Sequence, residues 1–322
     1  MAVFTKIDSN DIKKIEKNFN LGKIKKVDGI KKGIENTNYL IKFNNKKFVL
    51  TIFEKRVKVK DLPFFMKLMS GLASLNINCP KPMKTKKNSY LFNIRNKKAC
   101  LVSFLKGNDK KNLTPKDCYV LGKNIAILHK ATNKLNLSRK NSLDVKSWSQ
   151  LNKKIDKRIN KLSKNLKYEI GENILNIQKN WPKKLPRGVI HSDLFVDNIF
   201  FYKKKFYGFI DFYFSSTDFY AYELATCINA ICFNKKKGQY VLDSKKSSNI
   251  LKGYQKIRKL NSSEKNKFNI LCRGSALRYL LTRSYDFLNT PKSAIIKVKD
   301  PKEYLKKLIF HNQISKFDSY SR

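Results

Sequence analysis

Four polar residues between positions 191 and 211 have the types and spacing needed to move a phosphoryl group. Asp193 follows His191 by two residues, Asn198 follows Asp193 by five, and Asp211 follows Asn198 by thirteen. Phosphoryl transfer to a hydroxyl needs a group that accepts the hydroxyl proton and oxygen ligands for Mg²⁺, with little covalent help from the protein. Asp193 is our candidate for the first role, and Asn198 with Asp211 for the second. We expect His191 to brace the loop.

The surrounding elements would position these groups. Residues 189–190 predict a short buried strand that leads into the loop, and the apolar runs at 199–202 and 206–210 flank three lysines and predict a hairpin. Its ends would bring Asn198 and Asp211 side by side, and two hard oxygen ligands suit Mg²⁺. The order matches the pattern H-x-D-x-x-x-x-N followed by a metal-binding Asp. A surface loop that is rich in Asp and Asn by accident is the alternative, and the spacing and hairpin argue against it.

The composition is that of a globular protein. The chain has 322 residues, of which 41% are hydrophobic and 12% aromatic, so a large core in two lobes is expected. It has no apolar run of about 18 residues and no signal-peptide pattern at its start, which predicts a cytoplasmic protein without a membrane span. Six cysteines without a C-x-x-C pair predict buried, reduced thiols, and three histidines without a His/Cys cluster argue against zinc.

The net charge of +46 raises the possibility of nucleic-acid binding. Only ten of the 70 basic residues are Arg, however, and the lysines are spread along the chain among many Asn and Ile residues. Arg is the residue that recognises phosphates and bases bidentately. The pattern therefore favours the bias of an A+T-rich coding sequence. A nucleic-acid-binding protein on an inactive scaffold is the alternative from another class.

The first third of the chain predicts a sheet. Residues 39–43 and 48–53 predict a hairpin, residues 61–75 a helix, and residues 90–94 and 99–105 two further strands. The turn before the hairpin holds three candidate nucleotide-binding residues, because backbone N–H groups there can approach phosphates closely, and an ordinary hairpin without a ligand is the alternative. They are Gly33, Asn36 and Asn38. The backbone at Ser103 and Leu105 is expected to hydrogen-bond an adenine ring.

The remainder predicts helices. Thr114-Pro115 is a typical helix start, and further helical patterns cover 145–180, 220–233, 244–259, 262–289 and 303–313. The sequence thus predicts an α+β fold with two lobes. An N-terminal antiparallel-sheet lobe, 1–105, would bind the nucleotide. A mainly helical lobe, 106–322, would carry the catalytic and substrate-binding residues.

The loop HSDLFVDN at 191–198 and the run IDFYF at 210–214 resemble the aminoglycoside phosphotransferase and choline kinase-like superfamily, small-molecule kinases with a protein-kinase-like fold. Within it, the opening 22 residues and the segments GIENTNYLIKF, FVLTIFEKRV and IDFYFSSTDFYAYELATCINAICF are similar to the homoserine kinase family of bacterial threonine biosynthesis. The similarity covers nearly the whole chain. It implies ATP and Mg²⁺ as cofactors and L-homoserine as the acceptor, phosphorylated to O-phospho-L-homoserine.

Carried onto this chain, the resemblance implies that Asp193 deprotonates the acceptor hydroxyl, that Asn198 and Asp211 hold Mg²⁺, and that His191 braces the loop. One position departs from the protein-kinase pattern, in which a strand Lys holds the ATP phosphates. Thr51 stands at that place. Lys42, Lys55 and Arg56 are the candidates to replace it, and the sequence does not choose among them.

The acceptor site is predicted from charges. Asp218 and Glu223 are candidates to face a substrate ammonium, with a structural role at the start of the following helix as the alternative. Arg278 and Arg283 are candidates to bind a carboxylate bidentately, with internal ion pairs as the alternative. The runner-up function is another small-molecule kinase, acting on an aminoglycoside, choline or another amino alcohol. Few acids follow Asp211, which favours a small zwitterion. The expected partners are L-homoserine and ATP, and the expected state is a monomer or homodimer.

Overall fold

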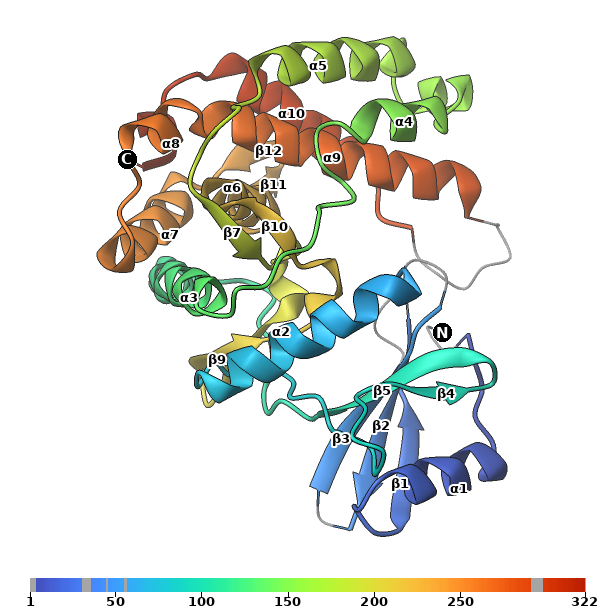
Figure 1. The fold of residues 1–322 in the computed structure, drawn as a ribbon. Helices are drawn as coiled ribbons and strands as arrows, with labels where there is room; N and C mark the ends of the chain where they lie inside the picture. Colours follow the sequence, from blue (N-terminus) through green and yellow to red (C-terminus); the bar gives the residue numbers. More distant parts are fainter. Residues whose placement is uncertain (1–3, 31–35, 45, 55–56, 291–297, 322) are drawn as a thin grey trace. The chain divides into compact units, whose positions relative to one another are not determined.

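The computed structural model describes residues 4–30, 36–44, 46–54, 57–290 and 298–321 of the chain (Figure 1). The chain forms two compact units, one of residues 1–108 with 200–213 and the other of residues 109–199 with 214–322. The hairpin at residues 199–209 therefore groups mainly with the N-terminal unit, whereas the predicted boundary at residue 105 placed it in the second lobe. The first unit is built on a sheet and the second mainly on helices, which confirms the predicted α+β class. Among the described residues, no helix is long and apolar enough to cross a membrane.

The first unit contains a five-stranded antiparallel sheet in the order β1-β2-β3-β5-β4. The predicted hairpin is present, with Thr37 opposite Ile52 and Phe43 opposite Lys46. Alternating burial along β2 shows which face of this hairpin meets the core. The strands are β1 (Ile24–Gly29), β2 (Thr37–Phe43), β3 (Lys46–Ile52), β4 (Phe92–Ile94) and β5 (Lys97–Ser103).

Two helices belong to this unit. Helix α1 (Ser9–Asn18) begins with a capping box formed by Asp8 and Asp11, and it places Ile15 in a core cluster with the strand residues. Helix α2 (Leu62–Ser74) has a proline in its first turn and buries six apolar side chains. The predicted helix at 61–75 is thus confirmed.

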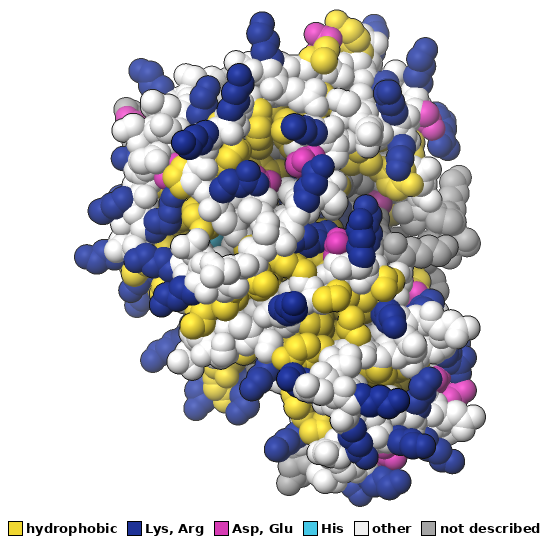
Figure 2. Space-filling model, viewed as in Figure 1, with side chains coloured by type: hydrophobic (Ala, Val, Ile, Leu, Met, Phe, Trp, Pro, Cys, Tyr) yellow, Lys and Arg dark blue, Asp and Glu magenta, His cyan; other side chains and the backbone are white. Residues whose placement is uncertain are grey.

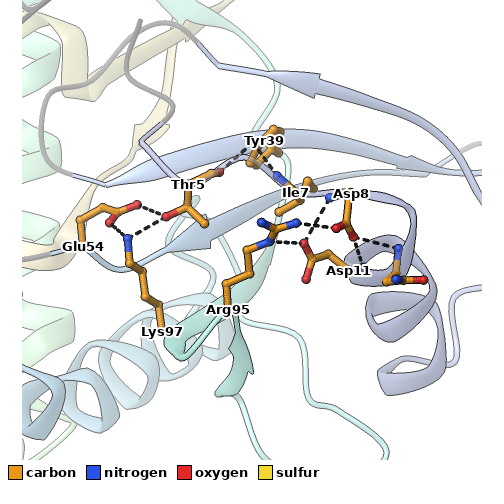
Figure 3. A network of polar contacts seen from close by, with 9 residues as sticks. Thr5, Ile7, Asp8, Asp11, Tyr39, Glu54, Arg95 and Lys97 are labelled. Atoms are coloured by element: carbon orange, nitrogen blue, oxygen red, sulfur yellow. Dashed lines mark hydrogen bonds and ion pairs between the residues drawn. The ribbon is translucent and has the colours of Figure 1, made fainter.

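A polar network ties the N-terminal segment to the sheet of the first unit (Figure 3). Glu54, just after β3, accepts hydrogen bonds from the Thr5 hydroxyl at 2.7 Å and from the ammonium of Lys97. Arg95 donates from its Nε to Asp11 of α1 at 2.7 Å. These bonds cross-link the start of the chain to β3 and to the β4–β5 turn, so this end of the sheet is held by charge as well as by packing.

The second unit is a set of helices around a buried centre. Helices α3 and α7 pack with their backbones close together, because a Cβ on Gly122 would lie 2.1 Å from the Ile250 carbonyl oxygen and one on Gly253 would lie 2.0 Å from the Tyr119 oxygen. Helices α6 and α9 form the middle of this unit and are mostly buried. The helices are α3 (Pro115–Asn133), α4 (Trp148–Lys153), α5 (Leu166–Asn180), α6 (Tyr220–Ile231), α7 (Ser244–Ile257), α8 (Ser262–Asn266), α9 (Phe268–Asn289), α10 (Lys302–Gln313) and α11 (Asp318–Ser321).

Short strands complete the fold. In the second unit β7 (Arg187–Ile190) pairs antiparallel with β10 (Ser216–Phe219), and β11 (Phe233–Lys236) pairs with β12 (Gln239–Leu242). In the catalytic segment β8 (Ile199–Tyr202) neighbours β9 (Lys205–Phe209), as predicted. Strand β6 is Asn108–Asp109.

Three differences from the expectations concern helices and hairpins. The predicted helix at 262–289 is broken at Lys267 into α8 and α9, the predicted helix at 220–233 stops at Ile231, and the β11–β12 hairpin was not foreseen. Its turn uses Lys237 and Gly238, both at positive φ. All six cysteines are free and buried.

Candidate active site

The loop after β7 presents the carboxylate of Asp193. Tyr279 of α9 donates its hydroxyl to one carboxylate oxygen at 3.0 Å, and the Asn198 amide nitrogen lies 3.3 Å from the other. The same Asn198 nitrogen donates to the Asp193 backbone oxygen at 2.8 Å, which closes the loop on itself. Burial raises the pKa of Asp193 above its ordinary value, although the Arg278 and His191 side chains act in the opposite direction. The site thus holds an oriented carboxylate with increased proton affinity.

A second carboxylate, that of Glu223, supports this loop. Glu223 of α6 is fully buried and accepts hydrogen bonds from the backbone N–H groups of His191 at 2.5 Å and Ser192 at 2.9 Å. Ser192 has a φ of 69°, a strained conformation for a residue with a side chain. Burial alone would raise the pKa of Glu223, but the donors around it, His129 and the His191 backbone, hold that pKa below its usual value. Both Glu223 carboxylate oxygens thus bond to the loop backbone, and the role of Glu223 toward a substrate ammonium stays a prediction.

Arg278 of α9 lies against the same loop. It is buried, and its Nη1 donates to the Ser192 backbone oxygen at 2.7 Å and to the Tyr279 hydroxyl at 3.1 Å. Its guanidinium also lies 4.5 Å from the centre of the Tyr279 ring. Arg278 therefore holds the backbone of the residue before Asp193, and its buried Nε donor has no partner among the described residues.

Arg283, one turn and a half further along α9, is engaged differently. Its Nη1 forms an ion pair with Glu303 at 2.7 Å, and its guanidinium lies 4.4 Å from the centre of the Tyr304 ring. Arg283 and Glu303 line a hollow of about 350 Å³ in the second unit, together with Lys299 and Asp197. The internal ion pair, which was the alternative to carboxylate binding, is thus what the structure shows for Arg283.

Asp218 lies at a larger hollow of about 780 Å³ in the second unit, at the end of β10. Its carboxylate accepts hydrogen bonds from the Asn141 amide at 2.7 Å and from the Phe219 backbone N–H at 2.8 Å. Burial raises the pKa of Asp218, an effect that these hydrogen bonds oppose. Asp218 therefore has a local structural role and also faces a space large enough for a ligand.

The two metal-ligand candidates come from different units. Asn198 is buried, and because its amide nitrogen donates to Asp193 its amide oxygen is the atom suited to a cation. Asp211 follows β9 and has a φ of 63°, a conformation that Asp and Asn tolerate better than other side chains. No group of three or more His, Cys, Asp or Glu residues in the described part of the chain could hold a metal. An amide oxygen and a carboxylate are each ligands that Mg²⁺ accepts beside water and phosphates.

Three of the candidate nucleotide residues use a side-chain oxygen as an acceptor within the protein. The Asn36 side chain accepts from the Glu54 backbone N–H at 3.3 Å, that of Asn38 accepts from the Thr51 hydroxyl at 2.8 Å, and that of Ser103 accepts from the Lys81 backbone N–H at 2.9 Å. Some of their backbone groups are also bonded, because the Ser103 N–H donates to the Lys81 oxygen at 2.8 Å and the Asn38 oxygen accepts from the Ile30 N–H at 2.9 Å. Leu105 lies two residues past β5.

Other candidates for the phosphates are less well placed or not described. Gly33, Lys55 and Arg56 lie outside the residues that the structure describes. Lys42 is exposed on β2, and Thr51 is buried and bonded to Asn38.

Comparison with known proteins agrees with this geometry. Residues 26–256 match the phosphotransferase enzyme family. The homoserine kinases of Allorhizobium ampelinum and Agrobacterium fabrum are each 40% identical to this chain over 320 residues, covering 99% of it and 99% and 98% of their own lengths.

Solved structures share the fold. An amicoumacin kinase superposes with a TM-score of 0.73 at 13% identity, covering 95% of this chain and 93% of its own. A choline kinase from Cryptosporidium parvum superposes with a TM-score of 0.65 at 15% identity, covering 95% of each chain. These are all kinases of small molecules by name, and at this identity they establish the fold alone.

Proposed function

The chain belongs to the homoserine kinase family of phosphotransferase enzymes, and we propose that it transfers the γ-phosphoryl group of ATP to the side-chain hydroxyl of L-homoserine. The products are ADP and O-phospho-L-homoserine. The observation that carries this proposal is the 40% identity with homoserine kinases over 99% of the chain, because the loop that holds Asp193 specifies a phosphotransferase but not its acceptor.

In this proposal Asp193 accepts the proton of the acceptor hydroxyl as the oxygen attacks the γ-phosphorus. The hydrogen bond from Tyr279 orients one carboxylate oxygen, so the other can face the hydroxyl. Glu223 and Arg278 hold the backbone before Asp193 from two sides. His191 is buried within this loop and braces it. A rigid base in a fixed position contributes through orientation as well as proton affinity.

Asn198 and Asp211 are the proposed Mg²⁺ ligands. When bound, Mg²⁺ neutralises charge on the phosphates of ATP. The Asn198 side chain has one end on Asp193 and the other suited to the cation, so it would couple the position of the base to the metal. The backbone near Gly33, Asn36 and Asn38 would approach the phosphates, and that of Ser103 and Leu105 the adenine ring.

We assign the high positive charge no dedicated nucleic-acid role. Figure 2 shows Lys and Arg side chains scattered over the face in view, with hydrophobic and acidic side chains between them. On this face the dispersed lysines supply general attraction for an anion such as ATP and form no stripe that would follow a nucleic-acid backbone. The proposed setting is the cytoplasm, where ATP and free amino acids are present.

The test is ADP release by the purified protein with Mg·ATP and six separate acceptors: L-homoserine, L-serine, L-threonine, choline, ethanolamine and kanamycin. Turnover with L-homoserine at least about 100-fold above that with the others, in kcat/KM, is the expected result, since matched polar contacts discriminate strongly. If the protein preferred another acceptor, the assigned substrate would change, whereas the assigned catalytic residues would not. The Asp193→Asn variant, run in parallel, identifies any contaminating ATPase.

A further inference from the structure

The larger hollow of the second unit is lined by Tyr222, whose buried hydroxyl has no hydrogen-bond partner among the described residues, and the buried Arg278 Nε, which also has none, lies near Tyr222. We propose that this hollow binds the α-amino acid head group of the acceptor, with the Tyr222 hydroxyl and the Arg278 Nε donating to its carboxylate and Asp218 accepting from its ammonium. This inference rests on the proposed function and deepens it, because it assigns the acceptor a pocket and adds Tyr222, which no sequence pattern indicated.

The donors are the first observation. Tyr222 is 1% exposed and Arg278 is 3% exposed, yet the Tyr222 hydroxyl and the Arg278 Nε have no hydrogen-bond partner among the described residues. Buried polar atoms are nearly always paired, so an unpaired pair of neighbours calls for an explanation. The two groups lie close together, because the charge and a side-chain contact of Arg278 lower the Tyr222 pKa that burial raises, although no hydrogen bond of normal geometry joins the Tyr222 hydroxyl to the Arg278 Nε. A carboxylate beside these two groups would accept from both.

The lining of the hollow is the second observation. Tyr222 lines it together with Asp218, Asp144 and two tryptophans, Trp148 and Trp181. The Trp181 ring lies 5.5 Å from that of Trp148 and 5.6 Å from that of Tyr222, so the aromatic groups form a continuous wall. Aromatic faces and carboxylates are the groups that bind an ammonium. The hollow therefore offers anion donors and cation acceptors within one space, as a zwitterion requires.

Arg278 lies near Tyr222 of the hollow and also contacts the loop that carries Asp193. Its Nη1 donates to the Ser192 backbone oxygen at 2.7 Å, and Ser192 is the residue before Asp193. One guanidinium thus contacts this loop with one nitrogen, while its buried Nε has no partner among the described residues. If the carboxylate of the acceptor binds to Nε, the short carbon chain of the acceptor would direct its hydroxyl toward Asp193, the proposed base.

The smaller hollow is a weaker candidate for the head group. Its arginine, Arg283, is already in an ion pair with Glu303 at 2.7 Å, and Glu303 also accepts from Lys307. A ligand carboxylate there would have to displace an internal carboxylate, whereas Arg278 Nε and Tyr222 would gain a partner that they lack.

Tyr222→Phe is the decisive variant, because it removes one hydroxyl that bonds to nothing described in the protein and so should leave the melting temperature unchanged or raised. We expect the KM for L-homoserine to rise about tenfold or more, as for loss of a hydrogen bond to a charged group, while the KM for ATP stays within about twofold. As a competing ligand, 3-aminopropan-1-ol has the hydroxyl and ammonium of homoserine without its carboxylate. Its inhibition constant should be the same in both proteins.

Direct binding gives a second readout, since Trp148 and Trp181 are the two tryptophans of the chain and both line the hollow. L-homoserine added without ATP should change tryptophan fluorescence saturably, and the dissociation constant should rise in Tyr222→Phe. Tyr304→Phe is the matched control, because its hydroxyl is also buried and without a partner among the described residues but does not line this hollow.

The outcomes separate the two proposals. If wild-type protein phosphorylates L-homoserine and Tyr222→Phe leaves its KM unchanged, the pocket assignment fails and the proposed function stands. Equal weakening of homoserine and 3-aminopropan-1-ol would also overturn the assignment of Tyr222 to the carboxylate. If the wild-type protein prefers another acceptor, the proposed function fails, and a fluorescence response to that acceptor that requires a carboxylate and the Tyr222 hydroxyl would still support the pocket.

Discussion

Tyr279 donates its hydroxyl to the carboxylate of Asp193 over 3.0 Å, although the two residues are 86 positions apart in the chain. The Tyr279 ring is itself fixed, with Phe195 of the loop packed edge-on at 4.9 Å between ring centres. A helix in the middle of the second unit therefore sets the direction of the proposed base. This relationship explains how a loop that follows a four-residue strand can hold a carboxylate steadily enough for proton transfer.

Replacing Asp193 by Asn should separate binding from chemistry. The amide keeps the shape and can accept from Tyr279, but it cannot take up the hydroxyl proton, so we expect kcat to fall by about 10²–10⁴-fold. The dissociation constant for Mg·ATP, measured by calorimetry, should stay within about twofold. Turnover within tenfold of the wild type would remove Asp193 from the role of base.

The same substitution should change how stability depends on pH. The folded-state pKa of Asp193 is raised above its ordinary value of 3.8, mainly by burial, so the folded state binds this proton more tightly than the unfolded state does. The contribution of this group to the free energy of unfolding is therefore fully present below the ordinary pKa, and it is lost as the pH rises through the raised, folded-state pKa. The stability of the wild type relative to Asp193→Asn should fall across that window and then level off. Urea unfolding of both proteins at a series of pH values measures this; a difference that grows with pH would contradict it.

Glu223→Gln should weaken the hydrogen bonds that hold the loop without changing the proposed metal-binding or substrate-binding residues. A Gln side chain can accept only one of the two backbone hydrogen bonds now made to His191 and Ser192, so the free energy of unfolding should fall by about 1–3 kcal/mol. We expect kcat to fall more than either KM changes, because the loop carries the base. Denaturant unfolding and steady-state kinetics test this together. Unchanged kcat with lower stability would limit Glu223 to a role in folding.

The sequence predicted the parts of this site that are local in the chain. Asp193 and Asn198 lie within one loop, and their hydrogen bonds span five residues, so a spacing pattern could identify them. The β2–β3 and β8–β9 hairpins likewise depend on neighbouring residues. Local patterns of this kind hold because turn chemistry and alternating burial act over a few positions.

The sequence did not predict which distant residues contact one another at this site. The position of Tyr279 in the sequence does not indicate that it contacts Asp193. The sequence around Glu223 likewise does not distinguish a residue that binds a substrate from one that binds two backbone N–H groups. Strand β10 is Ser-Thr-Asp-Phe, a run without alternating hydrophobicity, and it becomes a strand by pairing with β7. These features arise from tertiary packing, which overrides local preference.

Substitutions at Asp211 can separate metal binding from backbone strain. Asp211 has a φ of 63°, which Asn tolerates and Ala disfavours, so Asp211→Asn should fold like the wild type while Asp211→Ala loses about 1 kcal/mol of stability. If Asp211 is a metal ligand, both variants should raise the Mg²⁺ concentration for half-maximal activity by at least about tenfold. The measurement is activity against free Mg²⁺ at fixed ATP. A normal Mg²⁺ response in Asp211→Asn would exclude it as a ligand.

Arg278→Lys tests whether the fork of the guanidinium, and not its charge alone, serves the acceptor. Lys is a single-point cation and cannot donate to the Ser192 oxygen and to a ligand with separate nitrogens at fixed angles. We expect the KM for L-homoserine to rise about tenfold to 100-fold, the KM for ATP to change much less, and kcat to fall because the loop loses a support.

Arg273→Lys on the same helix is the control for Arg278→Lys, since Arg273 donates to Asn176 at the surface, away from the loop. Its kinetics should match those of the wild type within about twofold. If Arg278→Lys instead raised both KM values equally, its guanidinium would be acting through the fold of the loop. The acceptor carboxylate would then have to bind elsewhere in the second unit, with the Arg283 and Lys299 hollow as the next position to examine by the same substitutions.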